Sequence, residues 1–343
     1  MSFKLGILDQ SPVFPEKTAF DALQDTIRLA QKAEQWGYAR FWVAEHHHMG
    51  DVAGSSPEVL ISHLLARTNA IQVGSGGVML QHYSPFKVAE NFHVLSTLSP
   101  GRVDLGVGKS PGGLPLSTKA LQHGTQHDGI HFEERLTFLK KLLDHSVEEA
   151  HPLSGIEALP KPPVKPEIFL LGGSASSARL AAELGVHFVF AKFLVGSEES
   201  LAQTSRIYRK LYPEGTFMAA VAVFAAPCEK EAKQIAAEHS LYKITIESGR
   251  TLTVQSYQQV EAFKKQAVEA FEVEEHKADM IAGTPEQVKG ELERIHYQYE
   301  VDEFILHTPI RKEEERVRSF ELLRPIAAGR AKRGLEQSIK ILP

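Results

Sequence analysis

Short apolar runs alternate along this chain with longer segments in which apolar residues recur every three or four positions. Apolar runs of strand length that are bounded by turn residues predict strands buried on both faces, and the longer segments predict amphipathic helices. The alternation predicts a parallel sheet covered by helices. The predicted strands are residues 3–9, 41–44, 73–80, 102–108, 168–171, 187–190, 217–224 and 303–306.

Capping residues mark where several helices begin. Thr18 with Asp21 resembles a capping box, and Gly37 suits the end of the same helix. A proline follows a serine or threonine at Pro57, Pro85 and Pro285, which is typical of the first position of a helix. Further helices are predicted over residues 132–143, 180–184, 201–211, 230–246 and 313–328.

About eight strand–helix units follow one another, which is the number that closes a (β/α)8 TIM barrel. The alternative is an open, doubly wound sheet, but the first unit lacks the Gly-x-Gly-x-x-Gly fingerprint of such folds. Residues 247–283 form a longer connection than a barrel needs. We therefore predict one α/β domain, residues 1–343, with a lid inserted at about 247–283. Because the ends of barrel strands share one face, we also expect residues 45–48, 76–83, 109, 172–177 and 307 to lie around one mouth.

Composition narrows the class of protein. With 43% hydrophobic residues the chain can bury a large core, and a net charge of -5 indicates no nucleic-acid partner. A single cysteine, Cys228, excludes an intramolecular disulfide and suits a reducing compartment. The apolar run near the N-terminus is too short for a signal peptide or a membrane span. We expect a cytoplasmic protein with a small-molecule substrate and no membrane partner.

Two glycines, Gly76 and Gly77, interrupt the third predicted strand. Glycines inside a strand indicate a bulge or a flat ligand that lies against bare backbone. The residues alone are equally consistent with a glycine-rich turn that binds no ligand.

A cluster of small residues, Gly173 to Ser177, lies between the fifth predicted strand and the following helix. Free N–H groups, the helix dipole and hydroxyls make a suitable phosphate site there, and Lys109 at the end of the preceding strand adds a cation. A simple helix N-cap is the alternative, although it would need only one serine. We favour a phosphate site formed by this loop together with Lys109.

The second predicted strand ends in Glu45-His-His-His48. Neighbouring side chains on an extended segment point to opposite sides, so at most two of these histidines could bind one metal ion. A histidine without a function is a further alternative. We favour proton transfer or hydrogen bonding by His46 or His47, because imidazole titrates near neutral pH.

A flat ring, a phosphate and a facing histidine together describe an FMN site. The chain resembles the bacterial luciferase-like flavin monooxygenases over nearly its whole length. The motifs that carry the resemblance are residues 41–47, 73–80, 85–90, 101–108, 173–177 and 283–287.

The resemblance implies a barrel enzyme that uses reduced FMN and O2 to oxidise a small organic substrate, with FMN reduced by a separate NAD(P)H:flavin reductase. It also implies a homodimer. The implied catalytic residue is His46, preceded by Glu45, and the implied cis peptide beneath the flavin ring is Gly76–Gly77. The implied phosphate contacts are Gly173, Ser174 and Ser177, with Lys109 in place of an arginine. Gly108 stands where true luciferases have a cysteine, so light emission is not indicated.

Three other functions remain open at this stage. A hydride-transferring oxidoreductase that uses a deazaflavin shares the barrel and a similar ring pocket. A flavin-binding protein without turnover would share the ring and phosphate contacts, although Glu45 and His46 argue against it. A metal-dependent hydrolase is the third. The organic substrate cannot be read from the sequence.

Overall fold

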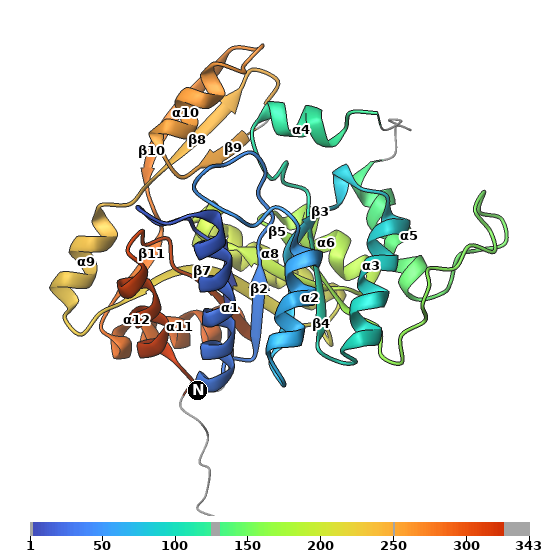
Figure 1. The fold of residues 1–343 in the computed structure, drawn as a ribbon, viewed down its shortest axis with the longest axis horizontal. Helices are drawn as coiled ribbons and strands as arrows, with labels where there is room; N and C mark the ends of the chain where they lie inside the picture. Colours follow the sequence, from blue (N-terminus) through green and yellow to red (C-terminus); the bar gives the residue numbers. More distant parts are fainter. Residues whose placement is uncertain (1–2, 125–130, 250, 326–343) are drawn as a thin grey trace, which may run out of the picture.

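The computed structural model describes residues 3–124, 131–249 and 251–325. Its centre is a closed barrel of eight parallel strands, in which each strand pairs with the next along the chain and the last returns to the first (Figure 1). This confirms the predicted TIM barrel. The barrel strands are β1 (Lys4–Asp9), β2 (Arg40–Val43), β3 (Gln72–Met79), β4 (Val103–Gly108), β5 (Glu167–Gly172), β6 (His187–Ala191), β7 (Phe217–Ala225) and β12 (Glu303–His307).

Helices surround the barrel. The capping box of Thr18 and Asp21 is present at the start of the first helix, and Gly37 ends that helix in the left-handed conformation, as predicted. A second capping box joins Thr284 and Gln287. The helices are α1 (Ala19–Trp36), α2 (Pro57–Arg67), α3 (Pro85–Leu98), α4 (Pro115–Leu121), α5 (Phe132–Leu143), α6 (Ala175–Leu184), α7 (Lys192–Val195), α8 (Glu198–Leu211), α9 (Glu229–Ala237), α11 (Pro285–Tyr299) and α12 (Glu313–Leu323).

One predicted helix extends beyond the described residues, and one observed strand was not predicted. Helix α12 ends at Leu323, and residues 326–328 of the predicted helix lie outside the described residues. An additional strand that the sequence did not predict, β11 (Met280–Gly283), pairs with β7 outside the barrel. Within the described ranges, no helix is both long enough and apolar enough to span a lipid bilayer.

The barrel interior is packed with side chains. Trp42, Phe169, Met218 and Ile305 form a buried cluster inside it, and the Trp42 and Phe169 rings meet edge to face with centroids 5.0 Å apart. A larger apolar cluster lies between the strands and the surrounding helices. Because the interior is filled, a ligand must bind at the ends of the strands.

An ion cluster lies where the barrel strands begin. Arg40 Nη1 is 2.8 Å from Asp104 Oδ2, and Arg40 Nε is 2.9 Å from Glu303 Oε1. The indole N–H of Trp42 donates to the same oxygen of Asp104 at 2.8 Å. All four side chains are buried. This cluster ties β2, β4 and β12 together at the end of the barrel opposite the predicted site.

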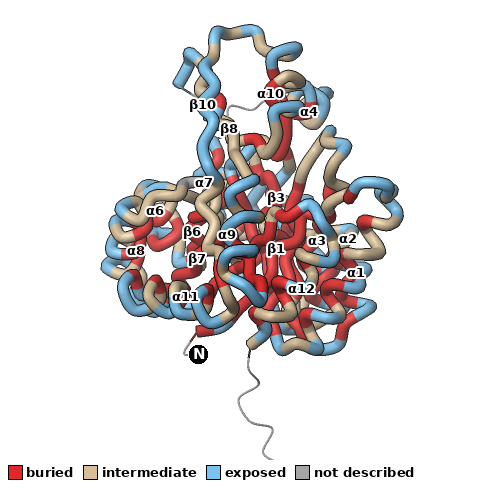
Figure 2. Tube along the Cα trace, turned by 90° about the vertical axis from the view of Figure 1, so that its left-hand side faces the viewer, coloured by how far each residue is buried: buried red, intermediate tan, exposed pale blue. Residues whose placement is uncertain are grey.

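The inserted segment forms a small sheet above the other end of the barrel (Figures 1 and 2). It contains β8 (Ser240–Ile246), β9 (Thr251–Val254), α10 (Tyr257–Lys264) and β10 (Phe271–Lys277), with the strands antiparallel in the order β10-β8-β9. The helix predicted over 230–246 was therefore wrong beyond Ala237, and the insertion begins before residue 247. Residues 240–246 form a strand because they pair on both sides with strands that lie later in the chain.

Candidate active site

The register of the barrel brings three predicted elements together. Met79 at the end of β3 pairs with Gly108 at the end of β4, and Gly108 pairs with Leu171 near the end of β5. Lys109 and the loop 172–177 therefore follow neighbouring strands at the same level. The predicted convergence of the glycine step, the lysine and the serine loop at one mouth is confirmed as a matter of geometry.

The Gly76–Gly77 peptide bond is cis, as predicted. The register between β3 and β4 shifts between Ser75 and Val78, so this step is also a bulge. A side chain at Gly77 would place its Cβ 2.8 Å from the carbonyl of Gly106, which is closer than such atoms come. Packing between β3 and β4 therefore requires glycine at position 77 whether or not a ligand binds.

Space is available at the end of β4. A Cβ at the half-buried Gly76 would come 2.6 Å from Cδ1 of Leu8, whereas a Cβ at Gly108 would meet no described atom within 4 Å apart from those of its chain neighbours. The missing side chain of Gly108 thus leaves room at the barrel mouth.

The serine loop forms both a helix cap and a hydroxyl cluster. Ser174 is the N-cap of α6, and its Oγ accepts a hydrogen bond of 3.2 Å from the backbone N–H of Ser177. The Ser174 hydroxyl lies 2.9 Å from that of Ser176 and 3.0 Å from that of Ser177. Ser174 and Ser176 are exposed, so hydroxyls and the start of a helix face the mouth, where an anion is favoured.

Lys109 is exposed beside this loop. Its Nζ is 3.4 Å from Glu133 Oε1 and 5.9 Å from the ring centre of Phe132. An exposed pair at that distance is weak, so the lysine can still bind an anion. Lys109 also lines a cavity of about 720 Å³, which Leu252 and Phe263 of the insertion enclose from the other side.

Glu45 is fully buried and accepts three hydrogen bonds. Nε2 of His47 and the hydroxyl of Tyr83 each lie 2.7 Å from its Oε1, and the backbone N–H of Met79 lies 3.0 Å from its Oε2. Burial and the nearby charge of Glu45 raise the pKa of Tyr83. The sequence placed Tyr83 at the mouth without a role, because its partner Glu45 lies on a different strand–helix unit.

His46 and His307 place two neutral imidazole rings at the mouth. Burial lowers the pKa of His46 to about 4, although the charges of Asp51 and Glu45 partly oppose this. Burial, together with Arg316 and His46, lowers the pKa of His307 to about 3. Nδ1 of each ring is buried and has no hydrogen-bond partner among the residues that the structure describes. The sequence placed His307 at the mouth but assigned it only as an available metal ligand.

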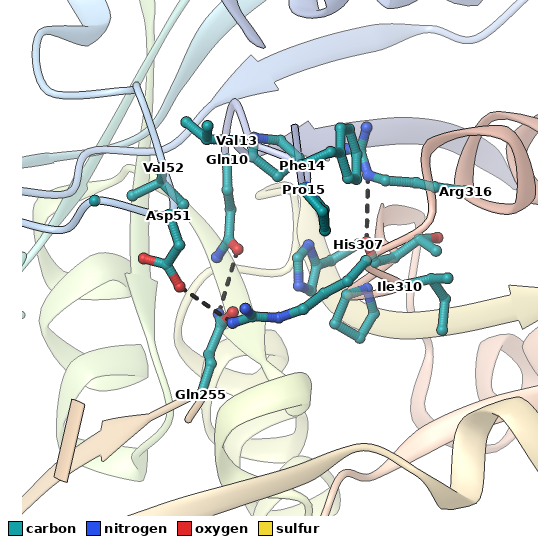
Figure 3. Close-up of a pocket in the computed structure, with 15 residues that line it drawn as sticks. Gln10, Val13, Phe14, Pro15, Asp51, Val52, Gln255, His307, Ile310 and Arg316 are labelled. Atoms are coloured by element: carbon teal, nitrogen blue, oxygen red, sulfur yellow. Dashed lines mark hydrogen bonds and ion pairs between the residues drawn. The ribbon is translucent and has the colours of Figure 1, made fainter. Parts of the chain in front are cut away.

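A smaller pocket of about 260 Å³ lies between the ends of β1 and β12. Gln10, His307 and Arg316 line it from the barrel, and Gln255 closes it from the insertion (Figure 3). No group of three histidine, cysteine or acidic side chains within the described part of the chain is placed to hold a metal ion.

Comparisons with known proteins agree with this geometry. The sequence model of the luciferase-like monooxygenase family matches residues 1–301. An N-acetyl-S-alkylcysteine monooxygenase of Bacillus subtilis (strain 168) is 45% identical over 323 residues, covering 93% of this chain and 97% of that protein. A luciferase-like monooxygenase of Escherichia coli (strain K12) is 30% identical, covering 92% of this chain and 95% of that protein.

Solved structures with the same fold include apo-MsnO8, with a TM-score of 0.75, 29% identity and coverage of 94% of this chain and 97% of that one. The oxygenating constituent of 3,6-diketocamphane monooxygenase from Pseudomonas putida, in complex with FMN, has a TM-score of 0.67 at 18% identity, covering 94% and 97% of the two chains. An F420-dependent secondary alcohol dehydrogenase has a TM-score of 0.64 at 16% identity, covering 95% and 100%. The last two likenesses concern the fold alone.

Proposed function

The chain belongs to the luciferase-like monooxygenase family, and we propose that it is an FMN-dependent monooxygenase that uses reduced FMN and O2 to oxidise a small organic substrate. The observation that carries this proposal is the placement of the Gly76–Gly77 step, Lys109 and the serine loop on the neighbouring ends of β3, β4 and β5.

The residues at the mouth fit such a cofactor. The hydroxyls of Ser174 and Ser177, the backbone at Gly173 and the charge of Lys109 would hold the phosphate. The space at Gly108, on the strand that pairs with β3, would receive the flavin ring. Reduced FMN would supply the electrons that activate O2.

His46 is the proposed acid/base. With a pKa of about 4 its ring is neutral at pH 7, and its buried Nδ1 accepts no hydrogen bond from any described residue. A neutral imidazole can accept a proton from the reacting group and later return it. Glu45 acts differently, because hydrogen bonds occupy both of its oxygens. We propose that Glu45 positions the strand end that carries His46.

The proposed substrate class is a thioether of an N-acylated amino acid. This follows from the 45% identity, over nearly the whole of both chains, to a protein named N-acetyl-S-alkylcysteine monooxygenase. The insertion closes over both the cavity of about 720 Å³ and the pocket of about 260 Å³, and as a lid it would exclude water from the reaction.

Two partners complete the proposal. A separate cytoplasmic NAD(P)H:flavin reductase would supply reduced FMN. A second copy of the chain would cover the apolar surface of α2 and α3, where Val59 and Leu98 are each 68% exposed.

The deciding experiment follows turnover of N-acetyl-S-methylcysteine with photoreduced FMN, in air and in parallel under ¹⁸O2. We expect the substrate to be consumed, with one ¹⁸O atom entering the organic product and the other entering water. The His46→Asn variant should bind FMN but lose turnover, while His48→Asn, which changes the exposed neighbour, should behave like the wild type. No FMN binding at micromolar concentration, or tighter binding of F420 than of FMN, would contradict the proposal and favour a deazaflavin-dependent hydride transfer.

A further inference from the structure

The pocket of about 260 Å³ joins the barrel to the insertion. Nε2 of Gln255 in the insertion donates a hydrogen bond of 3.2 Å to Oε1 of Gln10, which follows β1 (Figure 3). Phe14 and Ile310 provide apolar walls. The pocket is therefore small, partly apolar and lined by side-chain amides.

The charges that line this pocket are balanced. Arg316 Nη2 is 2.6 Å from Asp9 Oδ1. Arg311 Nη2 is 3.1 Å from Asp51 Oδ2, and Figure 3 marks this pair with a dashed line. Each arginine therefore already has a carboxylate partner. A charged ligand would lose its hydration here without gaining a free counter-charge, so the pocket favours an uncharged polar group.

The ring of His307 can accept a further hydrogen bond at one of its nitrogens. Its ring is neutral, since burial lowers its pKa to about 3, and a hydrogen bond to the backbone of Leu8 opposes that shift. Such a bond is made by a ring N–H to the Leu8 carbonyl, because only an acceptor would favour the protonated ring. The other nitrogen, Nδ1, then carries a lone pair, and it is buried without a partner. The group that the pocket lacks is an N–H.

We propose that this pocket binds an uncharged secondary amide of the substrate and thereby selects N-acylated over free amino acids. Nδ1 of His307 accepts the amide N–H, the side-chain amide of Gln10 or Gln255 donates to the amide carbonyl, and Phe14 and Ile310 contact the acyl carbon atoms. The inference rests on the proposed function, because it requires a substrate with an N-acyl group.

The pocket is connected to the strand end that carries the proposed acid/base. The loop that lines the pocket at Asp51 and Val52 continues to Gly54, whose carbonyl accepts a 2.8 Å hydrogen bond from the backbone N–H of His46. An amide held beside His307 would therefore lie on the side of the mouth where β2 ends.

Isothermal titration calorimetry on the full chain, with and without FMN, would test this with N-acetyl-S-methylcysteine and S-methylcysteine. One or two hydrogen bonds to the amide predict about tenfold tighter binding of the acetylated probe. Gln255→Met and His307→Phe should bring the two affinities close together. Gln234→Met, on the exposed surface of α9, is the matched control and should keep the preference.

Equal affinity for the two probes, binding of neither, or an unchanged preference in both variants would overturn the inference. If His307→Phe does not fold, Gln255→Met still tests the inference, because Gln255 lies in the insertion outside the barrel. FMN affinity is measured separately. A chain that discriminates the probes but does not bind FMN would overturn the proposed function, whereas one that binds FMN without discriminating would overturn only the amide site.

Discussion

The hydroxyl of Tyr83 donates a 2.7 Å hydrogen bond to Glu45, although the two residues are 38 positions apart in the chain. Glu45 follows β2, and Tyr83 follows the short 3-10 turn after β3, η1 (Leu80–His82). The bond therefore ties the ends of two neighbouring barrel strands together. The carboxylate is fully buried, so its partners decide whether its charge is tolerated there.

Tyr83→Phe should lower the free energy of unfolding by about 1–3 kcal/mol, because the buried carboxylate loses a donor. Urea unfolding followed by circular dichroism measures this. Tyr297→Phe removes a hydroxyl from a side chain that is 73% exposed and should change stability little. Equal effects of the two changes would show that the Tyr83–Glu45 bond is not important for stability.

Arg40→Ala should destabilise the fold by about 3–5 kcal/mol, because it leaves Asp104 and Glu303 buried without their cation. Denaturant midpoints at pH 7 give the comparison. The control is Arg28→Ala, whose exposed pair with Asp25 should contribute at most about 1 kcal/mol. A loss at Arg40 no larger than at Arg28 would refute the prediction.

Lys109→Met and Ser174→Ala should each weaken FMN binding about tenfold, since each removes a charged or hydroxyl contact to the phosphate. Quenching of flavin fluorescence reports the affinity. Riboflavin has no phosphate, so its affinity should stay the same in both variants. The exposed Lys87, changed to Met, serves as the charge control. A parallel loss of riboflavin affinity would place the phosphate elsewhere.

Val59→Asp or Leu98→Asp should convert a homodimer into monomers, because each puts a charge on the apolar surface of α2 and α3. Sedimentation velocity separates the two states. Val268, which is 87% exposed in the insertion, offers the matched control, and Val268→Asp should leave the dimer intact. A wild-type protein that sediments as a monomer would reject the proposed dimer.

Stability should fall as the pH is lowered from about 6.5 to about 4. The pKa of His46 in the folded chain is about 4 and that of His307 about 3, against an ordinary value of 6.5. Below pH 6.5 the unfolded chain therefore binds protons that the folded chain does not, which favours unfolding. The His46→Asn/His307→Asn double variant should show a shallower loss of unfolding free energy over this range. An equally steep loss would assign the pH dependence to other groups.

The local sequence pattern was sufficient to predict most of the strands and helices of the barrel. Runs such as 168–171 are apolar on both faces, and capping residues such as Thr18 and Thr284 act within one helical turn, so neighbours in sequence determine them. Residues 240–246 were wrongly predicted to be helical. They form a strand because they pair with β9 and β10, and the burial of Ile244 in this sheet depends on the same pairing. Such pairing between segments of the insertion leaves no periodic signal in either one.

The sequence by itself determined the barrel, the order of its strands and the family, because buried strands, helix caps and short motifs are local properties of the chain. Only the tertiary structure decided which side chains meet at the mouth. The partners of Glu45 come from the segment after β2, from the end of β3 and from the segment after η1. The pocket around His307 combines residues from the segment after β1, from β12 and from the insertion. Hydrogen bonds and burial depend on distances between separate segments, and those distances exist only once the barrel has closed.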